Sequence, residues 1–244
     1  MDSVYREIRP SPNLAPCIEC FWTGEVLNQF TARVLPDGCA DMLFIACKNE
    51  LIDMQVVGVM TRPQEVALAA GAFLLGVRFQ PGMAGACLGC DLQSLNDRTV
   101  SLRSIVGAAA TRFARCFSRN GPVEAKTSAI ENGLTSLPPL NNIQTAIGQL
   151  VGRQGQLSLP DFAALADVGP RQLRRLCLRH SGLAPKHLAR ILRFRHTATR
   201  LRNGESNMAE LALSCGYCDQ AHMIREFRNL AGISPGQYLR RQPE

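Results

Sequence analysis

The sequence repeats one pattern in residues 159–180, LPDFAALADVGPRQLRRLCLRH, and in residues 207–228, NMAELALSCGYCDQAHMIREFR. Each copy starts with a short apolar helix, passes through a turn that contains glycine, and ends with a basic helix. This pattern is typical of a helix-turn-helix, whose second helix enters the major groove of DNA. Two units in one rigid domain predict contact with two neighbouring segments of the groove.

Local residues mark the start of each of these helices. Ser158 and Asn207 precede the two short helices, and an acidic residue follows each of them three positions later, which is the spacing of a capping box. Pro170 suits the first position of the first basic helix, because the amide at that position has no partner within the helix. Asp219 can cap the second basic helix.

The two basic helices each divide into an apolar and a polar side. The apolar positions have helical spacing and should face the core; they are Leu173, Leu176 and Cys177 in the first helix and Met223, Phe227 and Leu230 in the second. The polar side of the first helix holds Arg171, Gln172, Arg174 and Arg175. We predict that these four residues reach base edges or phosphates, because arginine can form two hydrogen bonds to guanine.

A longer helix is predicted from Pro185 to Arg202, between the two copies. Leu188, Ile191 and Leu192 follow one side of it at helical spacing. A single helix of this length would fix the separation of the two basic helices, and we expect about one turn of DNA, roughly 34 Å. Ser234 and Pro235 then start a final helix.

This stretch resembles the DNA-binding domain of the AraC/XylS family of bacterial transcription regulators. The resemblance is carried by residues 183–201, LAPKHLARILRFRHTATRL, and residues 209–238, AELALSCGYCDQAHMIREFRNLAGISPGQY. It covers the chain from about Asn141 to the end, and it departs from the family pattern at Cys218 and Met223. The resemblance implies a DNA-binding domain over residues 139–244. By position it also implies DNA contacts in the second basic helix by Gln220, Ala221, Ile224 and Arg225.

The charge distribution agrees with a nucleic-acid partner. From Arg153 onward the chain holds 14 arginines and one lysine against seven acidic residues, a net charge of +8. Residues 1–152 hold 12 basic and 13 acidic residues. A basic helix side often serves only solubility, but two of them within this pattern favour double-stranded promoter DNA as the partner. We also expect contact with RNA polymerase.

The first half of the chain favours an α+β protein of several domains. Short apolar runs bounded by turn residues, such as ADMLFIA at 40–46 and AFLLGVRF at 72–79, predict strands of a small barrel or sandwich. Residues 35–44, LPDGCADMLF, and 74–82, LLGVRFQPG, resemble the cupin-like β-barrel sensor domains that precede some AraC-type domains. We therefore predict a barrel sensor domain over residues 1–101. A helical linker that can also form a dimer should follow over residues 102–138, ending at Pro138 and Pro139.

The sequence gives little support for an enzyme or for a membrane protein. The four histidines all lie in the second half, so a cupin metal enzyme would lack its usual ligands inside the barrel. No P-loop or HExxH pattern is present. No apolar run approaches the roughly 18 residues of a membrane span, and the charged N-terminus is unlike a signal peptide. We expect a soluble cytoplasmic protein that is not an enzyme.

The ten cysteines are unusual for such a protein. Cys17 with Cys20, and Cys87 with Cys90, have the CxxC spacing that lets two thiolates bind one metal ion or form a disulfide. Together they could form a four-thiolate site for a soft metal ion. The alternative is that the cysteines pack in the core as small apolar residues.

These observations leave several functions open. The leading hypothesis is a transcription regulator whose N-terminal domain binds a small effector. A regulator that senses a metal ion, an electrophile or an oxidant through its thiols is the second. The third is a constitutive DNA-binding protein whose barrel serves only dimerisation. The fourth is a DNA repair protein with a cysteine alkyl acceptor, although the sequence has no PCHR-like acceptor motif.

Overall fold

The apolar runs of the first half form antiparallel strands in the computed structural model, which describes residues 2–48, 50–117, 121–134 and 139–240. A six-stranded sheet has the order β1 (Ser3–Ile8), β2 (Ile18–Val26), β7 (Ala72–Phe79), β4 (Asp41–Cys47), β5 (Glu50–Val57) and β8 (Thr99–Ser101). A separate two-stranded sheet pairs β3 (Phe30–Val34) with β6 (Gln64–Leu68). The two apolar runs quoted above, residues 40–46 and 72–79, form β4 and β7 as predicted.

The predicted closed barrel is wrong, because the six-stranded sheet stays open. Its edge strands, β1 and β8, do not pair with each other among the described residues, and β3 and β6 pair only with one another. Pro36 follows β3 and Pro63 precedes β6, and a proline has no amide hydrogen to extend a ladder. β8 has only three residues, which leaves little edge for further pairing.

The two faces of the sheet differ because side chains alternate along each strand. Met42, Phe44, Leu75, Val77 and Phe79 are fully buried on one face. There the ring of Phe117 stacks on that of Phe44, with centroids 5.8 Å apart. Full burial of each large apolar side chain contributes about 1.5–3 kcal/mol. The opposite face is open toward β3, β6 and the C-terminal helices.

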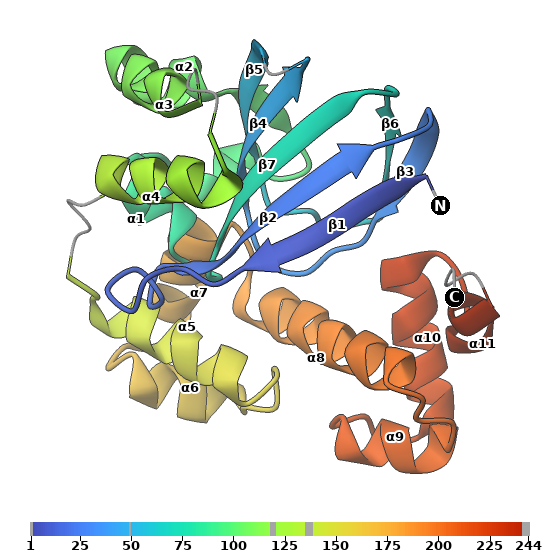
Figure 1. Cartoon of the computed structure of the whole chain (residues 1–244). Coiled ribbons are helices and arrows are strands. Elements are labelled where there is room, and N and C mark those ends of the chain that lie inside the picture. The colour runs from blue at the N-terminus through green and yellow to red at the C-terminus, as the bar shows by residue number, and fades with distance from the viewer. Residues whose placement is uncertain (1, 49, 118–120, 135–138, 241–244) are drawn as a thin grey trace.

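Short helices follow β7 and cover the buried face (Figure 1). They are α1 (Ala84–Leu88), the 3-10 helix η1 (Leu92–Leu95), α2 (Leu102–Val106), the 3-10 helix η2 (Gly107–Ala109), α3 (Ala110–Phe117) and α4 (Val123–Gly133). The predicted helix from residue 102 is interrupted at Gly107, whose φ of +58° is outside the helical region. Part of the predicted linker, including Pro138, lies outside the described residues.

The second half is helical, as predicted. Its elements are α5 (Asn142–Gly152), α6 (Leu159–Leu165), α7 (Pro170–Ser181), α8 (Pro185–Arg202), α9 (Met208–Ser214), α10 (Gln220–Ala231) and α11 (Pro235–Arg240). The two helix-turn-helix units are therefore α6–α7 and α9–α10, and α8 joins them. Ser158, Asn207 and Asp219 each cap a helix through a side-chain oxygen, which confirms the predicted helix starts.

Only one side of α6 is buried. Phe162, Ala163 and Ala166 are buried, but Leu159 and Leu165 are 47% and 42% exposed. A helix of seven residues makes about two turns and presents only one narrow side to the core.

The two halves pack directly on each other, with α8 lying along the open side of the sheet (Figure 1). The turn before β4 meets the N-terminal half of α8, where a Cβ built on Gly38 would lie 3.5 Å from Leu188. η1 and α1 both pack on α7. No helix in the described part of the chain is long and apolar enough to cross a membrane.

Candidate nucleic-acid interface and ligand cavity

The first basic helix, α7, presents its arginines to solvent. Arg171, Arg174, Arg175 and Gln172 are all exposed, while the predicted inward positions of the helix are buried or partly buried. None of these three guanidinium groups forms an ion pair with another described residue. They can therefore approach phosphates or base edges without first breaking an internal ion pair.

The second basic helix, α10, has a less charged exposed side. Gln220, Ala221 and Arg225 are exposed, and Ile224 is partly buried. At the start of the helix, Asp219 accepts a hydrogen bond of 2.7 Å from the amide of His222. The eight residues predicted to contact DNA therefore lie on the second helix of each unit, exposed or partly exposed.

Ion pairs and aromatic contacts fix α10 against α8. Arg190 of α8 forms a bidentate pair with Glu226, in which Nη2 lies 3.1 Å from Oε1. The ring of Phe227 meets those of Phe194 and Tyr238 edge-on, with centroids 4.8 Å and 5.3 Å apart. Each such aromatic pair contributes about 0.5–1.5 kcal/mol beyond the area it buries. The second unit is therefore firmly attached to α8.

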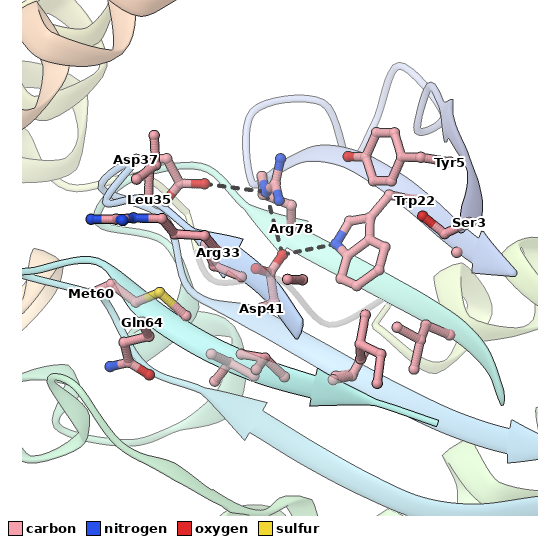
Figure 2. A pocket seen from close by; sticks show the side chains of 18 of the residues that line it. Ser3, Tyr5, Trp22, Arg33, Leu35, Asp37, Asp41, Met60, Gln64 and Arg78 are labelled. Carbon is pink, nitrogen blue, oxygen red and sulfur yellow. Dashed lines mark hydrogen bonds and ion pairs between the residues drawn. The ribbon is translucent and has the colours of Figure 1, made fainter. Parts of the chain in front are cut away.

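The open face of the sheet lines a cavity of about 1290 Å³, which the β3–β6 sheet, α8 and α11 also border. Strand register brings its polar residues together. In the ladders of β7, Asp41 lies opposite Arg78 and Trp22 lies opposite Gly76. Since residues two apart share a face, Trp22, Asp41 and Arg78 all point into the cavity (Figure 2).

Gly76 makes the arrangement of Trp22 possible. A Cβ built on Gly76 would lie 2.0 Å from Cε2 of Trp22, so any larger residue would displace the indole. With glycine there, Trp22 reaches across β7 and its Nε1 donates a hydrogen bond of 3.2 Å to Asp41 on the next strand. The ring of Tyr5 stacks on the indole from β1, with centroids 6.0 Å apart.

Arg78 lies among three carboxylates at this end of the cavity, and Figure 2 shows two of them, Asp37 and Asp41. Its Nε is 3.5 Å from both Asp37 and Asp41, and its Nη1 is 3.9 Å from Glu7. Burial raises the pKa of Asp37 and of Asp41, and Arg78 only partly offsets this. The pKa of Arg78 is raised in turn, because the attraction of the two aspartates outweighs the effect of burial.

The cavity also borders the helix that joins the two helix-turn-helix units. Arg195 of α8 forms an ion pair with Glu19, and its Nη1 lies 3.2 Å from Oε2. The buried thiol of Cys39 donates a hydrogen bond of 3.1 Å to the same oxygen. A charged contact of α8 with the sheet therefore lies at the cavity wall.

Side chains of the N-terminal half bind the C-terminal ends of both basic helices. Asn96 donates a hydrogen bond of 2.5 Å to the carbonyl of Gly182, the residue that ends α7. Arg33, which lines the cavity, donates one of 2.6 Å to the carbonyl of Ala231, the last residue of α10. We call these two hydrogen bonds the C-terminal clamps.

The four cysteines of the predicted metal site are not brought together. Cys17 and Cys87 are hydrogen-bonded neighbours, whereas Cys20 lines the cavity beside Arg78. In the described part of the chain no three histidine, cysteine or acidic side chains are placed to hold a metal ion.

Their thiols are also poor nucleophiles. Burial raises the pKa of all four, to about 11 for Cys20 and about 12 for Cys87, where Cys17 adds to the effect. The thiolate is the metal ligand and the nucleophile. These environments therefore favour core packing over thiol sensing or alkyl transfer.

The residues that line the cavity could not be identified from the sequence. Arg78 within an otherwise apolar strand, and a single tryptophan in the whole chain, were the available indications. Neither indicates a cavity by itself, because the site forms only when strands far apart in the sequence pair.

Comparisons with known proteins follow the same division of the chain. A family described as a domain of unknown function (DUF6597) matches residues 6–101. A family described as a helix-turn-helix domain matches residues 162–241.

Among curated proteins, the transcriptional activator RhaR of Yersinia pseudotuberculosis is 28% identical over 102 residues, which are 42% of this chain and 34% of RhaR. An uncharacterised helix-turn-helix regulator of Haemophilus influenzae is 23% identical over 148 residues, 60% of this chain and 49% of that protein. The chain thus spans about a third to a half of the length of these relatives.

Two solved structures are similar in part. An AraC-type regulator from Chromobacterium violaceum is 25% identical with a TM-score of 0.39, covering 42% of this chain and 95% of that one. ToxT from Vibrio cholerae is 13% identical with a TM-score of 0.44, covering 90% of this chain and 96% of that one.

Proposed function

We propose that the chain is a DNA-binding transcription regulator of the AraC type, which binds a promoter by inserting α7 and α10 into two successive major-groove segments. The observation that supports this most is the pair of capped helix-turn-helix units with exposed, unpaired arginines on α7. Their attachment to a common helix, α8, favours binding as one unit.

We propose distinct roles for the two helices. Arg171, Arg174 and Arg175 have the length and fork geometry for guanine edges or phosphates, with Gln172 beside them. On α10 the exposed set is Gln220, Ala221, Ile224 and Arg225. Gln220 suits adenine, Arg225 suits guanine, and the apolar Ala221 and Ile224 suit the methyl group of thymine. The first unit would thus make most of the charged contacts with DNA, and the second would make more of the apolar contacts with bases.

The N-terminal residues 1–101 are proposed to sense an effector within the cavity, and residues 102–138 to serve as a linker. A cavity that touches both the sheet and α8 gives a bound molecule contacts with both halves of the chain. Any ligand that moves Arg195 or Arg33 would alter the position of α8 or of α10. RNA polymerase and a second copy of the chain remain predicted partners.

Footprinting of the full chain on its own upstream region tests this proposal. We expect protection of two groove segments on one side of the duplex, about 34 Å apart. Random duplex DNA of equal length, at the same salt concentration, is the control, because non-specific binding depends strongly on salt. Protection of a single segment, or equal affinity for random DNA, would contradict the proposal.

A further inference from the structure

The inner end of the cavity has more negative than positive groups. Asp37, Asp41 and Glu7 all lie within 3.9 Å of Arg78, so three carboxylates share one guanidinium group. Glu19, which also lines the cavity, already has its own partner in Arg195. A positively charged group that entered here would meet carboxylates whose charge Arg78 only partly neutralises.

The other cavity arginines lie on its helix-facing side and already have partners. Arg33 donates to the carbonyl of Ala231, and Arg202 donates a hydrogen bond of 3.1 Å to the hydroxyl of Tyr238. Among the described residues, these contacts leave other N–H donors of Arg33 and Arg202 free, so an anionic ligand would bind at the helix-facing side of the cavity and away from the carboxylates around Arg78. A cationic ligand at the inner end would break none of these contacts.

Aromatic rings lie beside the carboxylates. Trp22 and Tyr5 both line the cavity and stack on each other, and the indole Nε1 is already bonded to Asp41. The π-electrons of indole attract a cation placed over its face, more strongly than those of any other side chain. Carboxylates beside an indole are thus a combination that recognises ammonium groups.

The remaining wall suits an apolar ligand body. Between the strands and the β3–β6 sheet it is formed by aliphatic and aromatic side chains, namely Val26, Phe30, Leu43, Ile45, Val66 and Leu74. A small, highly hydroxylated molecule would leave this surface in contact with water. A ligand with an apolar body would bury it, which is favourable in proportion to the area covered.

We propose that this cavity binds organic cations with an apolar body, the positive head lying beside Asp37 and Asp41 next to Trp22. This inference rests on the proposed function only in treating such a cation as the effector. The binding site itself is defined by the geometry of the sheet.

Trp22 provides the assay, because it is the only tryptophan in the chain. The emission of the full-length protein is titrated with phenylbutylamine, phenylbutyltrimethylammonium, phenylbutanol and phenylbutyrate, which share one apolar body. We expect both cations to change the emission and to bind about tenfold tighter than the alcohol and the carboxylate. Equal or tighter binding of the alcohol or the carboxylate would overturn the proposal.

Matched variants assign the effect to the carboxylates. Asp41→Asn keeps an oxygen that can accept the indole hydrogen bond, and Asp37→Asn removes a second charge. Each should weaken binding of the amine about tenfold while leaving that of the alcohol unchanged. Glu50→Gln, an exposed acid outside the cavity, should change neither. Equal loss for amine and alcohol would indicate a damaged cavity and would overturn the role of charge.

A gel-shift assay separates this inference from the proposed function. Promoter DNA is titrated with the full chain in the absence and presence of saturating phenylbutylamine. Failure to bind DNA specifically would contradict the proposed function and leave the cation site standing. A cation that binds but leaves promoter affinity unchanged would overturn its role as an effector.

Discussion

The guanidinium group of Arg33 in β3 donates a hydrogen bond of 2.6 Å to the main-chain oxygen of Ala231 at the end of α10, across 198 positions of sequence. A positive group near the C-terminal end of a helix also interacts favourably with the helix dipole. Because Arg33 lines the cavity, one side chain contacts both the proposed sensing site and the second helix-turn-helix unit.

Arg33→Ala should therefore weaken cooperation between the two units. We expect affinity for DNA with both groove segments to fall about tenfold, since a hydrogen bond from a charged group contributes about 1.5–3 kcal/mol. Affinity for DNA with only the segment bound by α7 should stay the same. Both are measured by gel shift, with Arg9→Ala, an exposed arginine outside the cavity, as the control. Equal loss on both DNAs would contradict this prediction.

Two glycine variants test the C-terminal clamp between Asn96 and Gly182. Gly182 and Gly204 both have positive φ, +72° and +91°, so alanine should cost each about 1 kcal/mol of unfolding free energy. Only at Gly182 would the new Cβ also meet a neighbour, 2.4 Å from Oδ1 of Asn96. We expect Gly182→Ala to lower the free energy of unfolding in urea further than Gly204→Ala does. Adding Asn96→Ala to both variants should remove most of that difference, since only the main-chain oxygen of Leu92, 3.3 Å from the new Cβ, would remain close. Equal losses in the two single variants would argue against a tight contact.

Arg174→Ala tests base readout by α7. If Arg174 binds a base edge, the difference in binding free energy between specific and random DNA should shrink by about 1–3 kcal/mol. Sequence preference should relax in one groove segment. Selection of bound sequences from a random pool measures this. Arg115→Ala, an exposed arginine in α3, is the control. An equal fall for specific and random DNA would assign Arg174 to a phosphate.

Binding of the amine should depend on pH. Burial raises the pKa of Asp37 to about 6, against the pull of Arg78 and with a further rise from Asp41. Below that pH the carboxyl is protonated, so affinity should fall as pH drops through about 6 and level off above it. The charged and titratable groups around Asp37 are Arg78, Asp41, Cys20 and Cys39, with Glu19 and Arg195 joined to Cys39.

The same titration on Asp37→Asn provides the comparison, because the step near pH 6 should disappear with the carboxyl group. The stability of the ligand-free protein should depend on pH in the opposite direction. The folded state holds the proton of Asp37 more tightly than the unfolded chain, so this residue lowers the free energy of unfolding as pH rises from about 4 to about 6. A step that persisted in the variant would assign the pH dependence to another group.

Alkylation of the cysteines tests whether the N-terminal half senses its signal through thiols. Raised pKa values leave little thiolate at Cys17 and Cys87 at neutral pH, whereas Cys218 is exposed. We expect iodoacetamide to label Cys218 well before those two, as measured by mass spectrometry of peptides. Rapid labelling of Cys17 or Cys87 in the folded chain would revive a thiol-sensing role for the N-terminal half.

The helical half could be predicted closely because its determinants are local. Side chains such as Ser158 and Asp219 cap helices within three residues of themselves, and the apolar spacing of α7 and α10 fixes which side faces the core. The bounds of α8 follow from Pro185 in the same way. The exposure of Leu159 and Leu165 has no local determinant in the sequence, because it depends on how much of α6 its neighbours cover.

The sheet could be predicted only as a set of strands. Whether it closes depends on pairing between segments far apart, and the open edges at β1 and β8 leave no local trace in the sequence. The cavity depends on this pairing even more. Trp22 and Asp41 come together because Gly76 lies between them on β7, a relationship that spans three strands.

The attachment of both units to α8 has a consequence for binding thermodynamics. Once α7 occupies its groove segment, α10 meets the next one at an effective concentration set by geometry, independent of how much protein is present. That effective concentration is highest when the spacing of the units matches that of the DNA, and it falls when they move freely. A molecule that displaced Arg33 from Ala231 would thus change promoter occupancy without altering any group that touches a base.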